Sequence, residues 1–212
     1  MATERFEGRA VSRRIGVLGG AFNPPHVGHL VLAHEATYQL GLERVLLVPV
    51  GEAPHRTIDP EPGPEVRLEL VRVAVEGDGG LEASDVEVAR EGPSFMFRTL
   101  ELLQEREPDD ELILLMGADV AASLESWKEP GRVLELARIA VAGRPGTILD
   151  EAEAALESLG GSGEMIRMPE LGISSTRIRR RVAAGRPIRY LVPEAIERMI
   201  TERGLYGAGA VE

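Results

Sequence analysis

Runs of apolar residues and amphipathic segments alternate along almost the whole chain. Nearly continuous apolar runs predict buried strands at residues 15–18, 44–50, 112–116 and 139–142, and weaker runs predict two more at 81–88 and 165–168. Apolar residues at helical spacing predict helices over 30–40, 66–75, 95–106, 150–159, 174–184 and 193–203. One or two short helices fit within 118–137, interrupted near Pro130 and Gly131, and Ser94 is expected to cap the helix that ends near Arg106.

Strands that alternate with helices in this way predict an α/β fold with a doubly wound parallel sheet. The chain has 212 residues without an internal repeat or a clear linker, so residues 1–212 are expected to form a single domain. Ligands of such sheets bind at the carboxyl ends of the strands, near the point where the strand order reverses. Gly19-Gly20 and Gly117-Ala118-Asp119 both fall at predicted strand ends and therefore mark a candidate site.

The segment GGAFNPPHVGH, residues 19–29, joins the first predicted strand to the first predicted helix. Its glycine pair, Gly19-Gly20, allows a tight turn and a close approach of a ligand to the backbone. His26 and His29 stand where the free N–H groups and the dipole of the helix favour an anion, and Gly28 leaves space between the imidazoles. Two donors beside a phosphate-sized pocket suit a reaction that builds charge on phosphoryl oxygens. A glycine turn with two solvated histidines is the plainer alternative.

A second candidate element is the segment ISSTRIRRR, residues 173–181, which begins another predicted helix. Ser175 and Thr176 supply hydroxyl groups at the helix N-terminus, which is again an arrangement that binds anions. Six arginines lie between 177 and 189 with no acidic residue among them, which is unusual in so acidic a chain. Arg179 is the best placed of them for phosphate, whereas a solvated basic face is the simpler interpretation of its neighbours.

Composition excludes several classes of function. The net charge is −11 at pH 7 and the isoelectric point is about 5.0, which disfavours nucleic-acid binding because that requires a basic surface. The chain has no cysteine, which removes disulfides, thiolate zinc sites and cysteine nucleophiles. No apolar run approaches the length of a transmembrane helix, and the polar N-terminus lacks the apolar core of a signal peptide. We therefore expect a cytoplasmic protein that binds neither membranes nor nucleic acids.

The segment at 19–29 resembles the HxGH signature of the nucleotidyltransferase superfamily, and the segment at 173–181 resembles its SSTxIR motif. The resemblance implies a Rossmann-like fold that transfers a nucleotidyl group, with residues 174–206 closing over the ATP site. It implies that the triphosphate contacts that stabilise the transition state come from the catalytic candidates His26, His29 and Arg179. The ATP-binding residues that it implies are Gly19, Gly20, Phe22, Gly28, Gly117, Asp119, Ser175 and Thr176.

Further segments resemble one branch of the superfamily, the bacterial nicotinate-nucleotide adenylyltransferases. They are GADVAASLESWKEP at 117–130, RPG at 144–146 and IRYLVPEAIERMITERGLY at 188–206. In that family a tryptophan at the position of Trp127 stacks on the pyridine ring, which is a reasonable contact for a flat heterocycle. The pyridine-nucleotide-binding residues implied by the resemblance are Arg56, Phe95, Met96, Trp127 and Arg144.

The chain departs from the family pattern at two places. Asn23 stands where the family usually carries Asp, which is a mild change because both are short turn-forming residues. PSFMFRTL at 93–100 replaces the family's PSYTxDTL, so Phe95, Met96 and Arg98 stand in place of Tyr, Thr and Asp near the expected nicotinate carboxylate. Side-chain donors are lost there, and backbone N–H groups or Arg98 would have to replace them.

The resemblance implies that ATP and nicotinate mononucleotide react to give nicotinate adenine dinucleotide and pyrophosphate, with Mg²⁺ bound to ATP. No general base is required, because the attacking phosphate is already ionised near neutral pH, so catalysis rests on positioning and charge stabilisation. Nicotinamide mononucleotide and phosphopantetheine remain alternative acceptors, although the Trp127 segment and the chain length disfavour the latter. A catalytically silent nucleotide sensor is the other alternative, which the presence of both histidines disfavours. The sequence does not define the oligomeric state.

Overall fold

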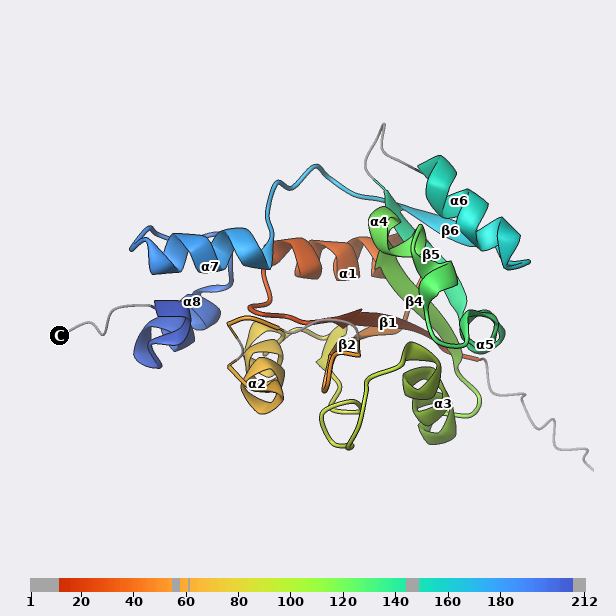
Figure 1. Cartoon of the computed structure of the whole chain (residues 1–212), viewed down its shortest axis with the longest axis horizontal. Coiled ribbons are helices and arrows are strands. Elements are labelled where there is room, and N and C mark those ends of the chain that lie inside the picture. The colour runs from red at the N-terminus through yellow and green to blue at the C-terminus, as the bar shows by residue number, and fades with distance from the viewer. Residues whose placement is uncertain (1–11, 55–57, 61, 144–148, 208–212) are drawn as a thin grey trace, which may run out of the picture.

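Six parallel strands form one sheet in the order β3-β2-β1-β4-β5-β6 in the computed structural model, which describes residues 12–54, 58–60, 62–143 and 149–207. The strands are β1 (Arg14–Gly20), β2 (Arg44–Pro49), β3 (Leu81–Ala83), β4 (Glu111–Gly117), β5 (Arg138–Gly143) and β6 (Gly163–Arg167). The helices are α1 (Val27–Leu40), α2 (Pro64–Ala74), α3 (Met96–Arg106), α4 (Ala118–Ala121), α5 (Pro130–Leu136), α6 (Leu149–Ser158), α7 (Ser175–Ala183) and α8 (Glu194–Glu202), with 3-10 turns η1 (Leu124–Ser126) and η2 (Leu205–Gly207) (Figure 1).

The strand order reverses between β1 and β4, which lie side by side at the centre of the sheet. Their parallel register pairs Ile15 with Leu112 and Leu18 with Leu115. The chain first adds β2 and β3 on one side of β1 and then crosses to add β4, β5 and β6 on the other side. The predicted doubly wound parallel sheet is therefore confirmed, and its switch point lies between the carboxyl ends of β1 and β4.

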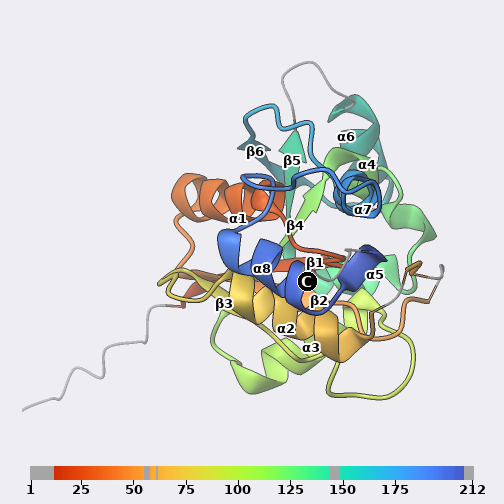
Figure 2. The same cartoon turned by 90° about the vertical axis from the view of Figure 1, so that its left-hand side faces the viewer.

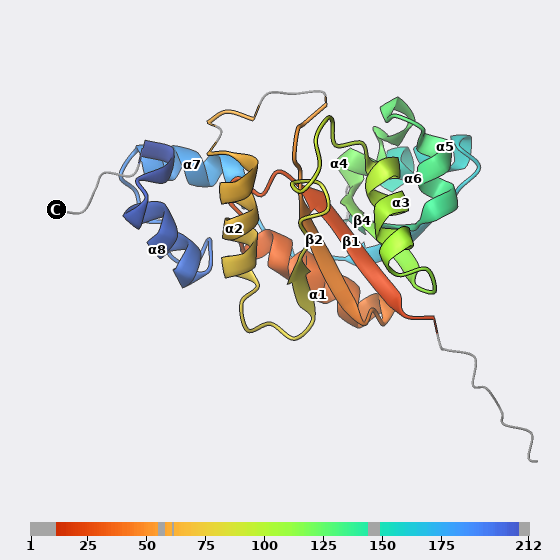
Figure 3. The same ribbon diagram turned by 90° about the horizontal axis from the view of Figure 1, so that it is seen from below.

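Helices cover both faces of the sheet. One face packs on α1 and α2 through side chains that include Leu18, Leu47 and Leu115. The other face packs on α3, α5 and α6 through alternate residues such as Val17 and Leu114. Figure 3 shows α1 behind the strands and α3 in front of them. Because both faces are buried, the strands are apolar throughout, which explains why continuous runs predicted them.

The C-terminal helices form a third apolar cluster at one end of the molecule. Ile178 of α7, Ile196 of α8 and Tyr206 of η2 pack there with Leu70 of α2. Figure 2 shows α8 beside α2, and the two helices are in contact. This cluster attaches α7 and α8 to the sheet through α2. No helix in the described ranges is long and apolar enough to span a membrane.

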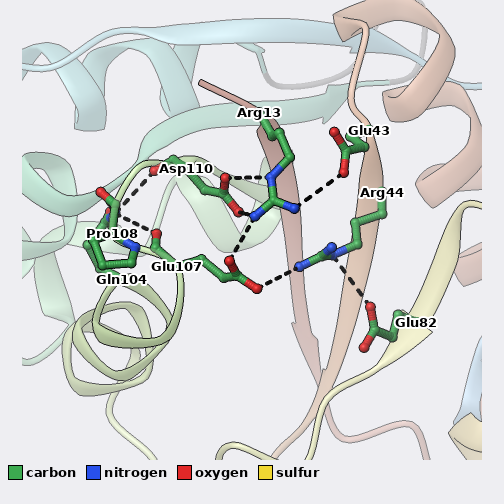
Figure 4. Close-up of polar contacts among 8 residues, drawn as sticks. All are labelled: Arg13, Glu43, Arg44, Glu82, Gln104, Glu107, Pro108 and Asp110. Carbon is green, nitrogen blue, oxygen red and sulfur yellow. Dashed lines mark hydrogen bonds and ion pairs between the residues drawn. The ribbon is translucent and has the colours of Figure 1, made fainter. Parts of the chain in front are cut away.

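A network of charged side chains surrounds the amino ends of the central strands (Figure 4). Arg13 donates to Asp110 at 2.8 Å and to Glu107 at 2.7 Å, which joins the start of β1 to the loop before β4. Arg44, at the start of β2, lies 3.5 Å from Glu107 and 3.4 Å from Glu82. Arginine and carboxylate thus neutralise one another at this edge of the sheet, which is the edge opposite the switch point.

Three details differ from the expectations based on sequence. Helix α1 begins at Val27 and not at Leu30, so His29 lies in its first turn. Strand β3 ends at Ala83, far short of the expected residue 88. Ser94 does not cap α3, because the N-cap of that helix is Phe95. The hydroxyl oxygen of Ser94 instead accepts a hydrogen bond from the Gly51 N–H at 3.0 Å.

One buried arginine joins the carboxyl ends of β1 and β2. Arg67 of α2 is fully buried and donates to the carbonyl groups of Ala21 at 3.2 Å, Val50 at 2.6 Å and Gly51 at 3.2 Å. Main-chain carbonyl groups that leave a sheet need new donors when they are buried. Arg67 supplies those donors, and it therefore fixes where the segments after both strands begin.

We expect Arg67→Met to lower the free energy of unfolding by about 3 kcal/mol, because it leaves several buried carbonyl groups without their donor. Urea denaturation measures the change. Arg72→Met is the matched control, because Arg72 lies on the same helix and is exposed. The control should change stability by less than about 0.5 kcal/mol. Equal effects of the two substitutions would contradict the role of Arg67.

Candidate active site

The carboxyl ends of β1 and β4 bring the predicted glycine segments together. Gly19 and Gly20 end β1, while Gly117 ends the neighbouring β4 and precedes α4. A Cβ built on Gly19 would lie 2.7 Å from the terminal methyl of Met96. A side chain at position 19 would therefore require the Met96 side chain to move. The strand-end expectation is thus confirmed for these segments.

The two histidines of the 19–29 segment form a stacked pair at the start of α1. Their ring centroids are 3.7 Å apart and their planes are inclined by 23°. The backbone N–H of His26 donates to Nδ1 of His29 at 3.2 Å, so the proton of the neutral His29 ring resides on Nε2. A Cβ on Gly28 would lie 3.1 Å from the His26 ring. Gly28 therefore leaves room for His26 itself.

Burial keeps both imidazoles neutral near pH 7. It lowers the pKa of His26 to about 4. The pKa of His29 falls to about 3, chiefly because of burial and secondly because of the neighbouring His26. Phe22 contributes to this environment, since its ring meets His29 edge-on with centroids 4.9 Å apart. Nδ1 of His26 is buried and has no hydrogen-bond partner within the described part of the chain.

A cavity of about 190 Å³ opens beside the histidine pair. We call it the histidine cavity; its lining residues are His26, Gly28, His29, Ala142, Gly143, Met168, Pro169, Leu171 and Ile173. The first three were predicted site residues, and Ile173 begins the candidate segment 173–181. Gly143 closes β5 at the same edge of the sheet, so the strand-end rule would have indicated it. The lining residues from 168 to 171 carried no comparable signal.

A second cavity, of about 350 Å³, lies at the same edge and is called the tryptophan cavity here. It brings together five predicted residues, namely Gly19, Gly20, Phe95, Met96 and Trp127. It also includes residues that were not among the predicted site residues, among them Val50, Ala53, Pro54, Glu87, Ser94 and Lys128. Arg98 does not line this cavity, because its guanidinium pairs with Glu101 at 3.1 Å on the outer side of α3. Arg98 is exposed to solvent and therefore does not replace the lost side-chain donors at this cavity.

Helix α7 is tied to the 19–29 segment by its first residues. The Ser175 hydroxyl donates to the carbonyl of Pro24 at 2.8 Å, and Arg179 donates to the carbonyl of Asn23 at 2.8 Å. Arg179 lies one turn along α7 from Ser175 and 3.4 Å from the Thr176 hydroxyl. The two motifs recognised in the sequence are therefore adjacent in the structure.

The remaining predicted residues are placed less directly. Asp119 lies in the first turn of α4 with an exposed side chain, and it lines neither cavity. Arg56 and Arg144 lie outside the described residues. Within the described ranges, no group of three or more His, Asp or Glu side chains is arranged to hold a metal ion.

The fold and the site together define a nucleotidyltransferase. The strand order is that of a Rossmann-like sheet, and the model of the cytidylyltransferase-like family matches residues 17–181. Two structures of the nicotinic acid mononucleotide adenylyltransferase of Plasmodium falciparum, complexed with NaAD and with APC, match with TM-scores of 0.74 and 0.73 at 16% identity. Both alignments cover 94% of this chain and 100% of the other, so the fold is shared throughout.

Curated relatives define the family more narrowly. The chain is 43% identical over 198 residues to the "Probable nicotinate-nucleotide adenylyltransferase" of Roseiflexus sp. strain RS-1. The alignment covers 92% of this chain and 98% of that protein. A relative of the same name from Desulfitobacterium hafniense strain Y51 is 39% identical over 201 residues, with coverage of 93% and 97%. The chain belongs to the nicotinate-nucleotide adenylyltransferase family.

The low pKa values of the histidine pair predict that the stability of the protein depends on pH. The pKa values of about 4 and about 3 lie below the ordinary value of 6.5, so the unfolded chain binds protons first on acidification. The contribution of both rings to stability is therefore present above pH 6.5 and is lost as the pH falls through the folded-state values. NMR titration of the imidazole carbons should show these low values, with His26→Asn used to assign the signals.

Inorganic tripolyphosphate tests the electrostatic basis of those values. A bound polyanion stabilises imidazolium, so saturating tripolyphosphate should raise the pKa of His26 and of His29. The imidazole of His34, which is exposed on the same helix and lies 2.8 Å from Asp78, is the internal control. Ordinary titration of both paired rings near pH 6.5 in the free protein would contradict their burial at the site.

Proposed function

We propose that the protein transfers the adenylyl group of ATP to nicotinate mononucleotide and releases pyrophosphate. The observation that carries this proposal is the neutral, stacked pair of His26 and His29 at the start of α1, at the same edge of the sheet as a cavity that Trp127 lines. In the reaction, an oxygen of the acceptor phosphate attacks the α-phosphorus of ATP, and the bond from that phosphorus to the bridging oxygen of pyrophosphate breaks. Both phosphates are already ionised, so the protein supplies position and charge stabilisation.

His29 is assigned the role of principal hydrogen-bond donor to the phosphoryl oxygens in this reaction. Its Nε2 carries the ring proton, because Nδ1 accepts the backbone N–H of His26. A donor fixed in this way needs no reorganisation when negative charge develops on the phosphoryl oxygens. His26 adds a second ring at the same place, and Arg179 adds a permanent positive charge from α7.

ATP is expected to enter with Mg²⁺ already bound to its phosphates. Magnesium keeps several waters and is often held by substrate phosphates together with few protein ligands. The described residues offer no cluster of three or more carboxylate or imidazole ligands, so the ion would be carried mainly by phosphate oxygens and water. The proposal includes residues 174–206 as the portion of a single domain that closes over ATP, and the cytoplasm as the place of reaction.

The tryptophan cavity is assigned to the pyridine ring of the acceptor. Phe95 and Met96 line it where α3 begins. The Phe95 N–H already donates to the carbonyl of Pro93 at 3.1 Å, so the first N–H groups within α3 are the backbone donors for a nicotinate carboxylate. Lys128 also lines this cavity and contributes positive charge.

One observation favours the amide, nicotinamide mononucleotide, as an alternative acceptor. Glu87 lines the same cavity with a buried carboxylate, which accepts a hydrogen bond from the Thr99 hydroxyl at 2.6 Å. A carboxylate can accept a hydrogen bond from a carboxamide, whereas it repels another carboxylate. The helix N-terminus and Lys128 oppose this effect, and we expect them to outweigh it.

His29→Ala should reduce kcat by roughly 10²–10³-fold while the KM for ATP changes far less, because its donor acts where charge develops. Initial rates of pyrophosphate release measure both constants. His34→Ala is the matched control on the same helix, since His34 is exposed, and it should leave both constants near those of the unaltered protein. A raised KM with an unchanged kcat would assign His29 to ground-state binding. Absence of pyrophosphate release from the unaltered protein would support a silent sensor.

The enzyme should prefer nicotinate mononucleotide over nicotinamide mononucleotide. Donors arranged for a carboxylate are left partly unpaired by an amide, and such mismatches discriminate strongly. The measurement is kcat/KM for both mononucleotides at the same Mg²⁺-ATP concentration. A ratio that favours the amide would reverse the assignment, and Glu87→Gln would then identify whether the buried carboxylate is responsible.

A further inference from the structure

Asn23 connects three segments that are far apart in the sequence. Its side-chain amide donates to the carbonyl of Pro60 at 2.7 Å, and its side-chain oxygen accepts the Tyr206 hydroxyl at 2.6 Å. Its main-chain carbonyl accepts the guanidinium of Arg179 at 2.8 Å. Only 2% of Asn23 is exposed to solvent. One buried residue of the 19–29 segment therefore holds the loop after β2, helix α7 and the turn after α8.

The contacts of the Asn23 side chain use both the donor and the acceptor of its amide. The Pro60 carbonyl can only accept a hydrogen bond, and the Tyr206 hydroxyl uses its proton as the donor to the side-chain oxygen. An amide provides one donor and one acceptor in the same plane and satisfies both partners. An ionised carboxylate of nearly the same shape can only accept, so one of its oxygens would face the Pro60 carbonyl without a proton between them. The bonding at position 23 therefore distinguishes Asn from Asp, which corrects the expectation that the departure from the family's usual Asp is mild.

The same contacts reach the proposed reacting groups on both sides. Asn23 lies in the loop that leads directly into His26, and its carbonyl orients Arg179. The other terminal nitrogen of Arg179 reaches the carbonyl of Asp59 at 3.3 Å, adjacent to Pro60. Arg179 and Asn23 thus hold neighbouring carbonyl groups of one loop and also hold each other. A displacement of the Asn23 side chain would move the guanidinium and the loop together.

We propose that Asn23 is a positioning residue for adenylyl transfer, which through its bonds to Pro60 and Tyr206 sets Arg179 in place beside the loop that leads into the histidine pair. This inference rests on the proposed function, because it assumes that Arg179 contacts the triphosphate. Asn23 touches no reacting atom in this account. Its effect on the rate passes through Arg179, and that dependence makes the inference testable.

The test is a double-mutant cycle built on Asn23→Asp and Arg179→Ala. Asn23→Asp alone should lower kcat/KM for ATP by roughly ten- to hundredfold, because small misplacements of a positioned group cost that much. In the Arg179→Ala background, the same Asn23→Asp change should alter kcat/KM by less than about twofold, which is the scatter expected of uncoupled sites. An equal loss in both backgrounds would overturn the proposal.

Tyr206→Phe provides a second, independent arm of the experiment. It removes the hydroxyl that donates to the side-chain oxygen of Asn23 and leaves the hydrogen bond from Asn23 to Pro60 intact. It should lower kcat/KM by a smaller factor than Asn23→Asp, and that factor should also disappear in the Arg179→Ala background. This arm keeps the proposal falsifiable if Asn23→Asp does not fold, which thermal unfolding will detect. A loss of activity that persists without Arg179 would show that Tyr206 and Asn23 act only on the fold.

Matched controls separate this inference from the proposed function. Tyr190→Phe removes the hydroxyl of an exposed tyrosine on the same C-terminal portion, and it should leave kcat/KM unchanged. If the unaltered protein releases pyrophosphate from ATP and nicotinate mononucleotide, the proposed function stands regardless of the cycle. If Arg179→Ala alone has no effect on kcat/KM, the positioning role of Asn23 fails while the reaction itself remains assigned.

Discussion

Main-chain carbonyl groups of the loop after β1 need donors that no neighbouring strand supplies, and the active site depends on how they are satisfied. Arg67 donates to the carbonyl of Ala21, Arg179 to that of Asn23 and Ser175 to that of Pro24. One donor, Arg67, comes from α2, and the other two come from α7. Buried carbonyl groups without partners are costly, so these bonds determine where α2 and α7 can sit relative to the sheet.

A loop held in this way explains why the histidine pair is set before any substrate arrives. The rings are stacked, one nitrogen of His29 is already occupied by a backbone N–H, and burial keeps both rings neutral. Groups that are fixed in advance do not reorganise as charge develops, which is the main source of electrostatic stabilisation in such sites. In the proposed reaction, the fold would contribute to the chemistry by restricting the motion of these donors.

The sequence predicted those features that depend on local pattern. Strands buried on both faces give continuous apolar runs, and glycine segments at strand ends indicated the switch point, as Gly19 and Gly117 show. It could not predict features that depend on distant contacts. Ser94 was predicted to cap a helix, but its hydroxyl accepts a hydrogen bond from the Gly51 N–H instead. Nothing in the helical pattern distinguished Arg67, although it donates to buried carbonyl groups such as that of Val50. Glu87 likewise gave no sign that it lines the tryptophan cavity.

The distribution of charge reconciles an acidic chain with anionic substrates. At the amino edge of the sheet, Arg13 and Arg44 are bonded to carboxylates and are largely neutralised. On α7 the arginines bond to carbonyl groups instead, as Arg177 does to Gly172 and Arg179 does to Asn23. A carbonyl group orients a guanidinium but does not cancel its charge. The positive potential of α7 therefore remains available to phosphate groups, although the chain as a whole carries a net charge of −11.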